Sequence, residues 1–212
     1  MIFTPQQFPA LIQDAPLCQN GGFAVFDQII TPELYAALLQ EAWDVLPRGK
    51  REDVEHSDSE EWRGGCPPRR FTTVPGKSQL DSLYHSVTVR DLLRPLIGFP
   101  ISPSGQRGQY ILYSECGDYI STHRDIESCD VVMITCLFDS RPRESLGGTL
   151  YFYPDRYNEP LSLIRQNPKQ GCVGIKLKLG QTLILFGGMV PHGIIPMASK
   201  QIRVVSTLCF QY

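Results

Sequence analysis

The chain has 212 residues, of which 42% are hydrophobic and 20% are charged, and its formal net charge is −2. This composition is typical of one soluble globular domain and excludes a disordered chain. No block of lysine and arginine dominates, and no run of about 18 apolar residues occurs, so we expect neither a nucleic-acid partner nor a membrane partner.

The N-terminus and the cysteines favour a cytoplasmic protein. The first residues lack the basic start of a secretory signal. The seven cysteines are odd in number and scattered, and no CxxC pair occurs, so we expect reduced thiols and no zinc–cysteine site. The cysteines are Cys18, Cys66, Cys116, Cys129, Cys136, Cys172 and Cys209.

Residues 1–105 carry mainly helical patterns and are expected to form a helical N-terminal support. Apolar residues recur at helical spacing after several cap-like residues. One short apolar strand is predicted at Phe23–Phe26. The helices are expected to begin near Thr4, Thr31, Ser78 and Thr88.

Residues 46–77 interrupt this helical half. They are dense in charge, glycine and proline and have no apolar period, which is typical of a surface loop. Long loops inside compact domains also act as lids. The functional alternative is therefore a lid in which Trp62, Arg69 or Arg70 touches substrate.

Residues 106–212 change to short β-rich segments separated by glycine and proline turns. About eight such strands in succession predict a jelly-roll or barrel, which would join residues 1–105 in one integrated domain. The predicted strands are Gln109–Tyr113, Asp130–Phe138, Thr149–Tyr153, Leu161–Ile164, Val173–Leu177, Thr182–Phe186, Gly193–Met197 and Ile202–Phe210.

Two of the four histidines are candidate metal ligands. His56 lies in the charged segment and His85 in a helical region, so each is expected to be solvated or structural. His123 belongs to the sequence His123-Arg124-Asp125. Residues i and i+2 of a strand point to the same face, so this imidazole and this carboxylate can bind one ion side by side.

His192 can supply a third ligand for the same ion. It lies near the start of a late predicted strand, and distant strands become neighbours in a rolled sheet. Two neutral nitrogens and one carboxylate on one face leave other coordination positions open, which is typical of non-haem Fe(II) oxygenases. The sequence therefore predicts an Fe(II) centre.

Arg203 lies on the last predicted strand, and alternation places it on one face with Val205, Thr207 and Cys209. A lone arginine in an apolar strand is costly unless it meets an anion. Either a local acid satisfies it, or its guanidinium binds a dicarboxylate co-substrate in bidentate fashion.

These residues resemble the 2-oxoglutarate- and Fe(II)-dependent dioxygenases, in particular the prolyl-hydroxylase-like branch. The motif His123-x-Asp125, the distal His192 and Arg203 carry the resemblance, which covers about residues 105–212. Three further stretches are similar to segments of that family. They are Tyr113 to His123, Gly147 to Pro154 and Gly180 to Phe186.

The resemblance implies a mainly β protein with a double-stranded β-helix core and helices packed on the major sheet. It implies that His123, Asp125 and His192 hold Fe(II) and that Arg203 binds the distal carboxylate of 2-oxoglutarate. Tyr113 is a second expected partner of this co-substrate.

Two positions depart from the family pattern. Some branches have a serine two residues after the arginine, where this chain has Val205, and Thr207 is the expected substitute. The prolyl-hydroxylase tyrosine on the next strand is absent, and its place is expected near Thr135 or Leu137.

The implied reaction is hydroxylation of a C–H bond of a small metabolite with O2, with release of succinate and CO2; desaturation is a related outcome. The filled Asp125 position disfavours halogenation. The alternatives are hydroxylation of a protein or peptide side chain and, in another class, a non-catalytic β-barrel binding or sensing module.

Overall fold

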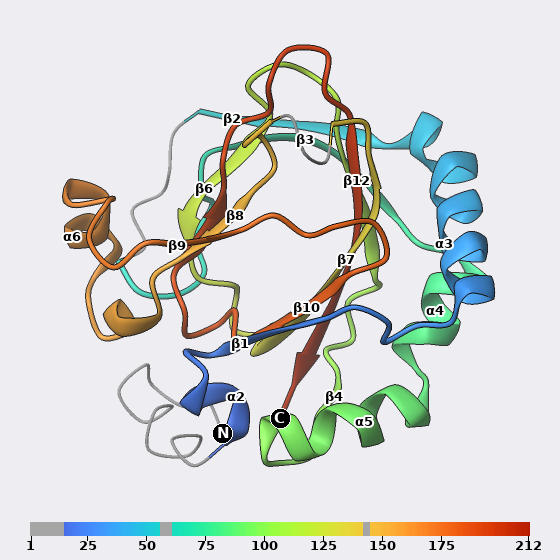
Figure 1. Ribbon diagram of the computed structural model, residues 1–212, viewed down its shortest axis with the longest axis horizontal. Helices are drawn as coiled ribbons and strands as arrows, with labels where there is room; N and C mark the ends of the chain where they lie inside the picture. The colour runs from blue at the N-terminus through green and yellow to red at the C-terminus, as the bar shows by residue number, and fades with distance from the viewer. Residues whose placement is uncertain (1–14, 56–60, 142–144) are drawn as a thin grey trace.

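The computed structural model describes residues 15–55, 61–141 and 145–212. Within these residues the protein is mainly β, and one twelve-stranded sheet curls round on itself, as Figure 1 shows. Its main path runs in the order β1-β10-β7-β12-β5-β3-β6-β11-β8-β9, with β2 beside β3 and β4 beside β12. This architecture is consistent with the expected jelly-roll core.

The strands are β1 (Phe23–Phe26), β2 (Lys50–Val54), β3 (Arg69–Pro75), β4 (Ser102–Pro103), β5 (Gln109–Tyr113), β6 (Tyr119–His123), β7 (Val131–Asp139), β8 (Leu150–Phe152), β9 (Val173–Ile175), β10 (Thr182–Leu185), β11 (His192–Ile194) and β12 (Arg203–Gln211). The helices are α2 (Pro16–Gln19), α3 (Pro32–Val45), α4 (Ser78–Tyr84), α5 (Val87–Ile97) and α6 (Leu161–Gln166), with 3-10 turns η1 (Leu46–Arg48) and η2 (Pro154–Arg156). No helix in this part of the chain combines the length and apolarity that a membrane crossing requires.

Strand β3 joins the two halves of the curled sheet. Its residues 72–75 pair with β5, and its residues 69–70 pair with β6, both in antiparallel register. The half that contains β7 and β12 and the half that contains β6 and β11 are therefore hydrogen-bonded through one strand, and the sheet encloses an interior.

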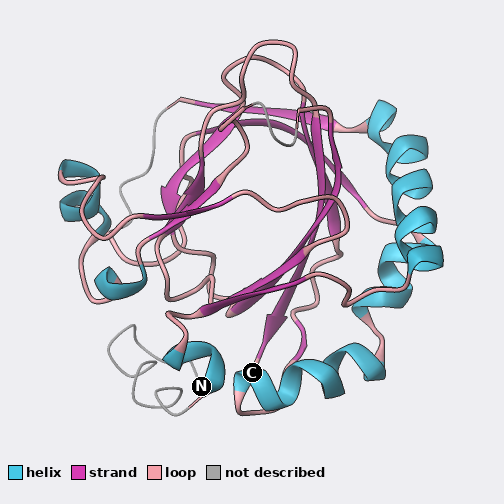
Figure 2. Cartoon of the chain, viewed as in Figure 1, coloured by secondary structure: helices cyan, strands magenta, loops and turns pink. Residues whose placement is uncertain are grey.

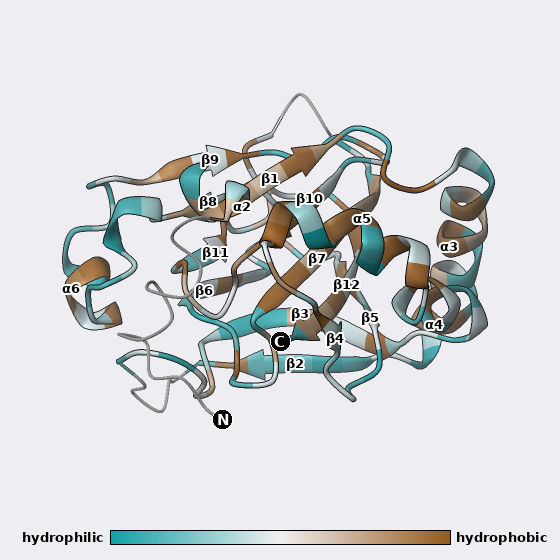
Figure 3. Ribbon diagram, turned by 90° about the horizontal axis from the view of Figure 1, so that it is seen from below, coloured by the Kyte–Doolittle hydropathy of each residue, from teal (hydrophilic) through white to brown (hydrophobic). Residues whose placement is uncertain are grey.

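Strand β7 is buried along nearly its whole length because it is covered on both faces. One face borders the interior and the other receives α3, where the Tyr35 hydroxyl donates to the carbonyl of Leu137 at 2.7 Å and Trp43 packs edge-on against Phe138. Figure 2 shows α3, α4 and α5 along one side of the sheet, and Figure 3 shows the apolar character of β7 and β10. Strand β7 therefore lies between the interior and α3.

The helix starts follow local capping chemistry. The Thr31 hydroxyl accepts from the amide of Leu34, and Pro32 occupies the first turn, as predicted. Helix α5 begins after Ser86, whose hydroxyl accepts from the amide of Val89, so the prediction of Thr88 as the cap is wrong by two residues. The helix predicted after Thr4 lies outside the described residues.

Two segments differ from the secondary structure predicted for them. Leu161–Ile164 forms a helix, because Leu161 and Ile164 are both buried at the spacing of one helical turn. The charged segment 46–77 contains β2 and β3, so it is not one long loop. Alternating charges on this hairpin pair across the two strands, which explains the missing apolar period.

The expectation that all cysteines are reduced is also wrong for one pair. Cys129 and Cys209 form a disulfide between the segment before β7 and the end of β12. The two cysteines are 80 residues apart, and neighbouring strands in the curled sheet bring them together. The remaining described cysteines, Cys18, Cys66, Cys116, Cys136 and Cys172, are free thiols.

Candidate metal centre

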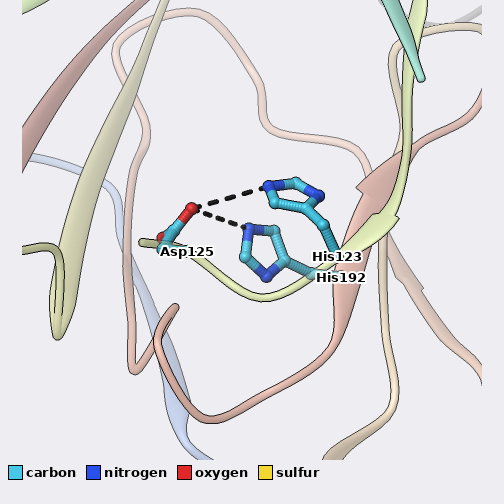
Figure 4. Close-up of side chains that lie close together, drawn as sticks. All are labelled: His123, Asp125 and His192. Carbon is cyan, nitrogen blue, oxygen red and sulfur yellow. Dashed lines mark ion pairs between the residues drawn. The ribbon is translucent and has the colours of Figure 1, made fainter. Parts of the chain in front are cut away.

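The three predicted ligands converge on one point at the interior of the curled sheet. His123 ends β6, His192 begins β11, and the two residues are direct cross-strand partners. The Nε2 atoms of His123 and His192 lie 3.5 and 3.7 Å from Oδ1 of Asp125. Figure 4 shows the carboxylate facing both rings. One candidate ligand atom from each residue lies within 4.8 Å of the others, so the set can hold one ion.

Main-chain carbonyls fix both imidazoles. Nδ1 of His123 lies 2.8 Å from the carbonyl oxygen of Ser121, and Nδ1 of His192 lies 2.9 Å from that of Val190. A carbonyl only accepts, so Nδ1 carries the proton and Nε2 keeps its lone pair. Burial, with the nearby His123, lowers the pKa of His192 to about 4, so this ring is neutral at neutral pH.

Asp125 is placed by a loop, which corrects the prediction that it lies on a strand with His123. Strand β6 ends at His123, and the amide of Asp125 donates to the carbonyl of Gly187 at 2.9 Å. A Cβ atom on Gly187 would lie 1.9 Å from Asp125 Oδ2, so only glycine leaves room for the carboxylate. Burial would raise the pKa of Asp125, but His192, His123 and Arg63 outweigh it and lower the pKa.

A β-bulge in β6 turns His123 toward the interior. His192 pairs with His123 and Ile194 pairs with Ile120, so two steps along β11 match three steps along β6. Ile120 and His123 both line the interior cavity, while Ser121 and Thr122 line a groove outside the sheet.

Arg203 lines the same cavity, and its guanidinium is only half engaged. Its Nη1 donates to Asp139 Oδ2 at 2.8 Å and, at 3.4 Å, to the carbonyl of Leu177. Its Nη2 is buried without a partner among the described residues. Both interpretations of Arg203 therefore hold in part: a local acid binds Nη1, and Nη2 has no partner among the described residues. Whether the guanidinium binds a dicarboxylate in bidentate fashion stays a prediction.

Tyr113 and Thr207 line the cavity with Arg203, as expected. Tyr113 pairs directly with Arg203 across β5 and β12, and burial raises the pKa of Tyr113, so its hydroxyl remains a donor. The Thr207 hydroxyl already makes a long contact of 3.5 Å to the carbonyl of Gln109. Whether either residue binds a co-substrate stays a prediction.

The sequence did not reveal Asp139, which pairs with Arg203 across β7 and β12. The tyrosine of the resembling family was expected near Thr135 or Leu137, but it is residue 139 that lies level with Arg203. One feature of the sequence could have indicated Asp139: it is an acidic residue at the end of a long apolar strand.

The interior cavity has a volume of about 150 Å³, and a second hollow of about 270 Å³ opens beside the metal ligands. A cavity of about 150 Å³ holds a molecule about as large as benzene. The cavity walls are mostly apolar, whereas the hollow, which we call the mouth, is bordered by Gly64, Gly65, Pro67, Arg69, Ile126 and the Cys129–Cys209 disulfide.

Two arginines fasten the segment before β3 to the metal centre. Arg63 donates to the carbonyls of Asp125 and Ile126 and pairs with Asp130 at 2.8 Å. Arg124, between two candidate metal ligands in sequence, is 1% exposed, and its guanidinium lies 5.5 Å from the ring of Trp62. The contacts of Arg63 thus connect the segment before β3, which borders the mouth, to the loop that carries Asp125.

The other residues of the proposed lid lie in different places. Arg69 borders the mouth and Arg70 pairs with Asp53 on the exposed side of the hairpin. Trp62 does not line the cavity or the mouth. His85 is exposed and far from the ligand set in sequence and fold, and His56 lies outside the described residues.

No protein-family model and no curated protein matches the sequence. Solved structures do match it. SnoN, a non-heme alpha-ketoglutarate-dependent epimerase from nogalamycin biosynthesis, is 16% identical with a TM-score of 0.63, over 96% of this chain and 83% of SnoN. A prolyl-4-hydroxylase from Pseudomonas putida is 15% identical with a TM-score of 0.61, over 95% of this chain and 97% of its own.

EctD from S. alaskensis with bound Fe is 17% identical with a TM-score of 0.62, over 93% of this chain and 78% of EctD. The chain has the fold of 2-oxoglutarate- and Fe(II)-dependent oxygenases. The resemblance seen in the sequence is confirmed for the fold. One structure of SnoN contains Fe3+ and alpha-ketoglutarate.

The residues of this chain fit both groups. Two neutral imidazole nitrogens and one carboxylate form the donor set that suits Fe(II) with open positions. The buried, unpartnered Nη2 of Arg203 requires an anion or another acceptor in the cavity. A short dicarboxylate supplies that acceptor.

Proposed function

We propose that this protein is an Fe(II)- and 2-oxoglutarate-dependent oxygenase with a double-stranded β-helix core. The convergence of His123, Asp125 and His192 beside a cavity that holds the free end of Arg203 carries the proposal. When bound, the iron and 2-oxoglutarate supply the oxidation of a C–H bond by O2, with release of succinate and CO2.

The chain's own residues orient and protect this chemistry. His123, Asp125 and His192 would hold the iron, and Arg203 would bind the distal carboxylate of 2-oxoglutarate with help from Tyr113 or Thr207. The apolar cavity walls, among them Ile134, exclude water from the bound groups. The cavity has room for the co-substrate, so the substrate would bind at the mouth.

We propose hydroxylation of a small metabolite, because the mouth of about 270 Å³ admits a small molecule or a single protruding group. Hydroxylation of a peptide side chain is the second candidate. It is favoured by a fold shared with a Trichoplax adhaerens prolyl hydroxylase in complex with a peptide fragment, at 14% identity and a TM-score of 0.59.

The test is O2-dependent conversion of 2-oxoglutarate to succinate by the iron-loaded protein, followed by a mass-spectrometric search for oxygenated products of metabolites and peptides. Asp125→Ala should abolish turnover and weaken metal binding at least tenfold, because one of three ligands is lost. Full turnover by that variant contradicts the proposal. A metal-bound wild-type protein without turnover on any substrate favours the binding or sensing module.

A further inference from the structure

A buried acid that the reaction does not itself require lies next to Arg203, one of the residues that line the cavity. Asp139 is 4% exposed, and each carboxylate oxygen accepts two donors. Oδ1 accepts from the Arg141 amide at 2.9 Å and from Gln201 Nε2 at 3.0 Å. Oδ2 faces Arg203 Nη1 at 2.8 Å and Lys176 Nζ at 3.2 Å.

The sheet register places this acid level with the arginine. Arg203 pairs with Asp139 on β7 and with Tyr113 on β5, so three neighbouring strands carry these side chains in one row. Directly opposite residues of antiparallel strands project to the same face. Gly148 lies against the Arg203 side chain, because a Cβ atom at residue 148 would lie 2.6 Å from Arg203 Cδ. The absence of a side chain at Gly148 therefore leaves the space that the Arg203 side chain occupies.

The charges of this cluster are unbalanced. Lys176 and Arg203 carry two positive charges and Asp139 carries one negative charge, so one positive charge remains beside the cavity. Burial alone would raise the pKa of Asp139, but hydrogen bonds from Arg141 and Gln201 and the charges of Arg203 and Lys176 lower it. Asp139 is thus ionised, and a single carboxylate in the cavity would neutralise the cluster.

We infer that Asp139 is a positioning residue for Arg203: it binds one end of the guanidinium and leaves the other end to select keto acids that bear a terminal carboxylate. This inference rests on the proposed function, which assigns Arg203 to the co-substrate. It adds that recognition uses the part of the guanidinium that Asp139 leaves free, and that its strength depends on an acid that never touches the ligand.

The experiment compares two keto acids on the Mn(II)-loaded protein by calorimetry. 2-Oxopentanoate has the five-carbon chain of 2-oxoglutarate but ends in a methyl group. Asp139→Asn should weaken 2-oxoglutarate binding about tenfold, because an amide cannot accept all four converging donors. It should change 2-oxopentanoate binding less than about twofold. In activity assays KM for 2-oxoglutarate should rise, while kcat should stay within about threefold.

Three further variants separate positioning from folding. Asp139→Glu keeps the charge and should retain the preference for 2-oxoglutarate within about threefold. In an Arg203→Gln background, Asp139→Asn should have no further effect on that preference. Glu41→Gln also removes a buried carboxylate with four donors, but one that does not line the cavity, and should leave the preference unchanged.

Equal weakening of both keto acids by Asp139→Asn would overturn the inference, and so would unchanged binding of 2-oxoglutarate. If Asp139→Asn folds poorly, loss of the preference in Asp139→Glu equal to that in Arg203→Gln overturns it as well. A wild-type protein that does not prefer 2-oxoglutarate over 2-oxopentanoate contradicts the proposed co-substrate instead, so the two failures are distinguishable.

Discussion

At the scale of single residues, both histidines of the candidate metal centre are oriented by the same kind of local hydrogen bond. Each donates its Nδ1 proton to the carbonyl of the residue two positions earlier, Ser121 for His123 and Val190 for His192. The orientation is therefore independent of any other side chain. Asp125 has no such local support, and its position depends on the packing of a glycine from another loop.

Gly187→Ala should weaken metal binding by at least tenfold, because the new methyl group would occupy the position of the Asp125 carboxylate. Titration of the apo variant with Co(II), followed by absorbance, measures this change. Gly174→Ala is the matched control, since its Cβ atom would meet only Thr149 at an ordinary 3.5 Å. Wild-type affinity in Gly187→Ala would show that the Asp125 carboxylate does not need this space.

At the scale of elements, α3 caps α4 with a side chain. No side chain of α4's own N-terminus caps it. Instead Glu41 of α3 accepts from the amides of Lys77, Gln79 and Leu80, and the Tyr110 hydroxyl of β5 donates to the same carboxylate. One carboxylate thus satisfies three free amides at a helix N-terminus and connects two helices to the sheet.

Glu41→Gln should lower the free energy of unfolding by about 2 kcal/mol, because an amide replaces a charged acceptor of four hydrogen bonds. Burial alone would raise the pKa of Glu41, but the donated hydrogen bonds lower it below its usual value of 4.5. Its contribution is therefore complete above pH 4.5 and is lost as the pH falls from there toward the lowered pKa.

Urea denaturation at neutral pH and at about pH 3.5 tests this expectation, because the lower pH lies about one unit below the usual pKa of glutamate. The stability difference between wild type and Glu41→Gln should shrink as the solution is acidified. If the stability difference stayed constant over this range, protonation of the Glu41 carboxylate would not be coupled to unfolding.

At the scale of the whole molecule, one buried guanidinium fastens several loops around the site. Arg124 donates to the carbonyls of Met189, Trp62, Tyr157 and Glu159 at 2.7 to 3.0 Å. Burial lowers the pKa of Arg124 to about 10, so the group is still charged at neutral pH. The loop before His192, the segment before β3 and the turn after β8 therefore meet at one side chain.

Arg124→Met should lower the free energy of unfolding by about 3 kcal/mol or more, because several buried carbonyls lose their donor. Urea denaturation of the apo protein measures this loss. Arg70→Met removes an exposed arginine from β3 and should leave the stability near that of the wild type. Equal stability of the two variants would show that the four contacts of Arg124 are not needed for folding.

The sequence predicted the convergence of His123, Asp125 and His192 better than it predicted the surroundings of Arg203. His123, Asp125, His192 and the alternating face of β12 follow from motif spacing and strand period. Asp139 does not, because its position depends on the register between β7 and β12, which shifts between Val204 and Val205. Long-range register is set by packing, and a single sequence does not encode it locally.

The helix at Leu161–Gln166 shows the corresponding limit for secondary structure, since four apolar-rich residues fit a short strand or one helical turn equally well. The Cys129–Cys209 disulfide shows that covalent links are also difficult to predict from the sequence. Scattered cysteines carry no sign of their pairing until the fold brings two of them together.

The bulge in β6 decides which face of the sheet His123 occupies. Side chains of a regular strand alternate, so two residues three positions apart, such as Ile120 and His123, would point to opposite faces, yet both line the interior cavity. Regular pairing of β6 through Ser121 and Thr122 would therefore turn the imidazole outward, away from Asp125 and His192. A chain with one residue fewer between these two positions would bring the imidazole inward without a bulge, so an irregularity that looks like a defect in the ladder aims a candidate metal ligand.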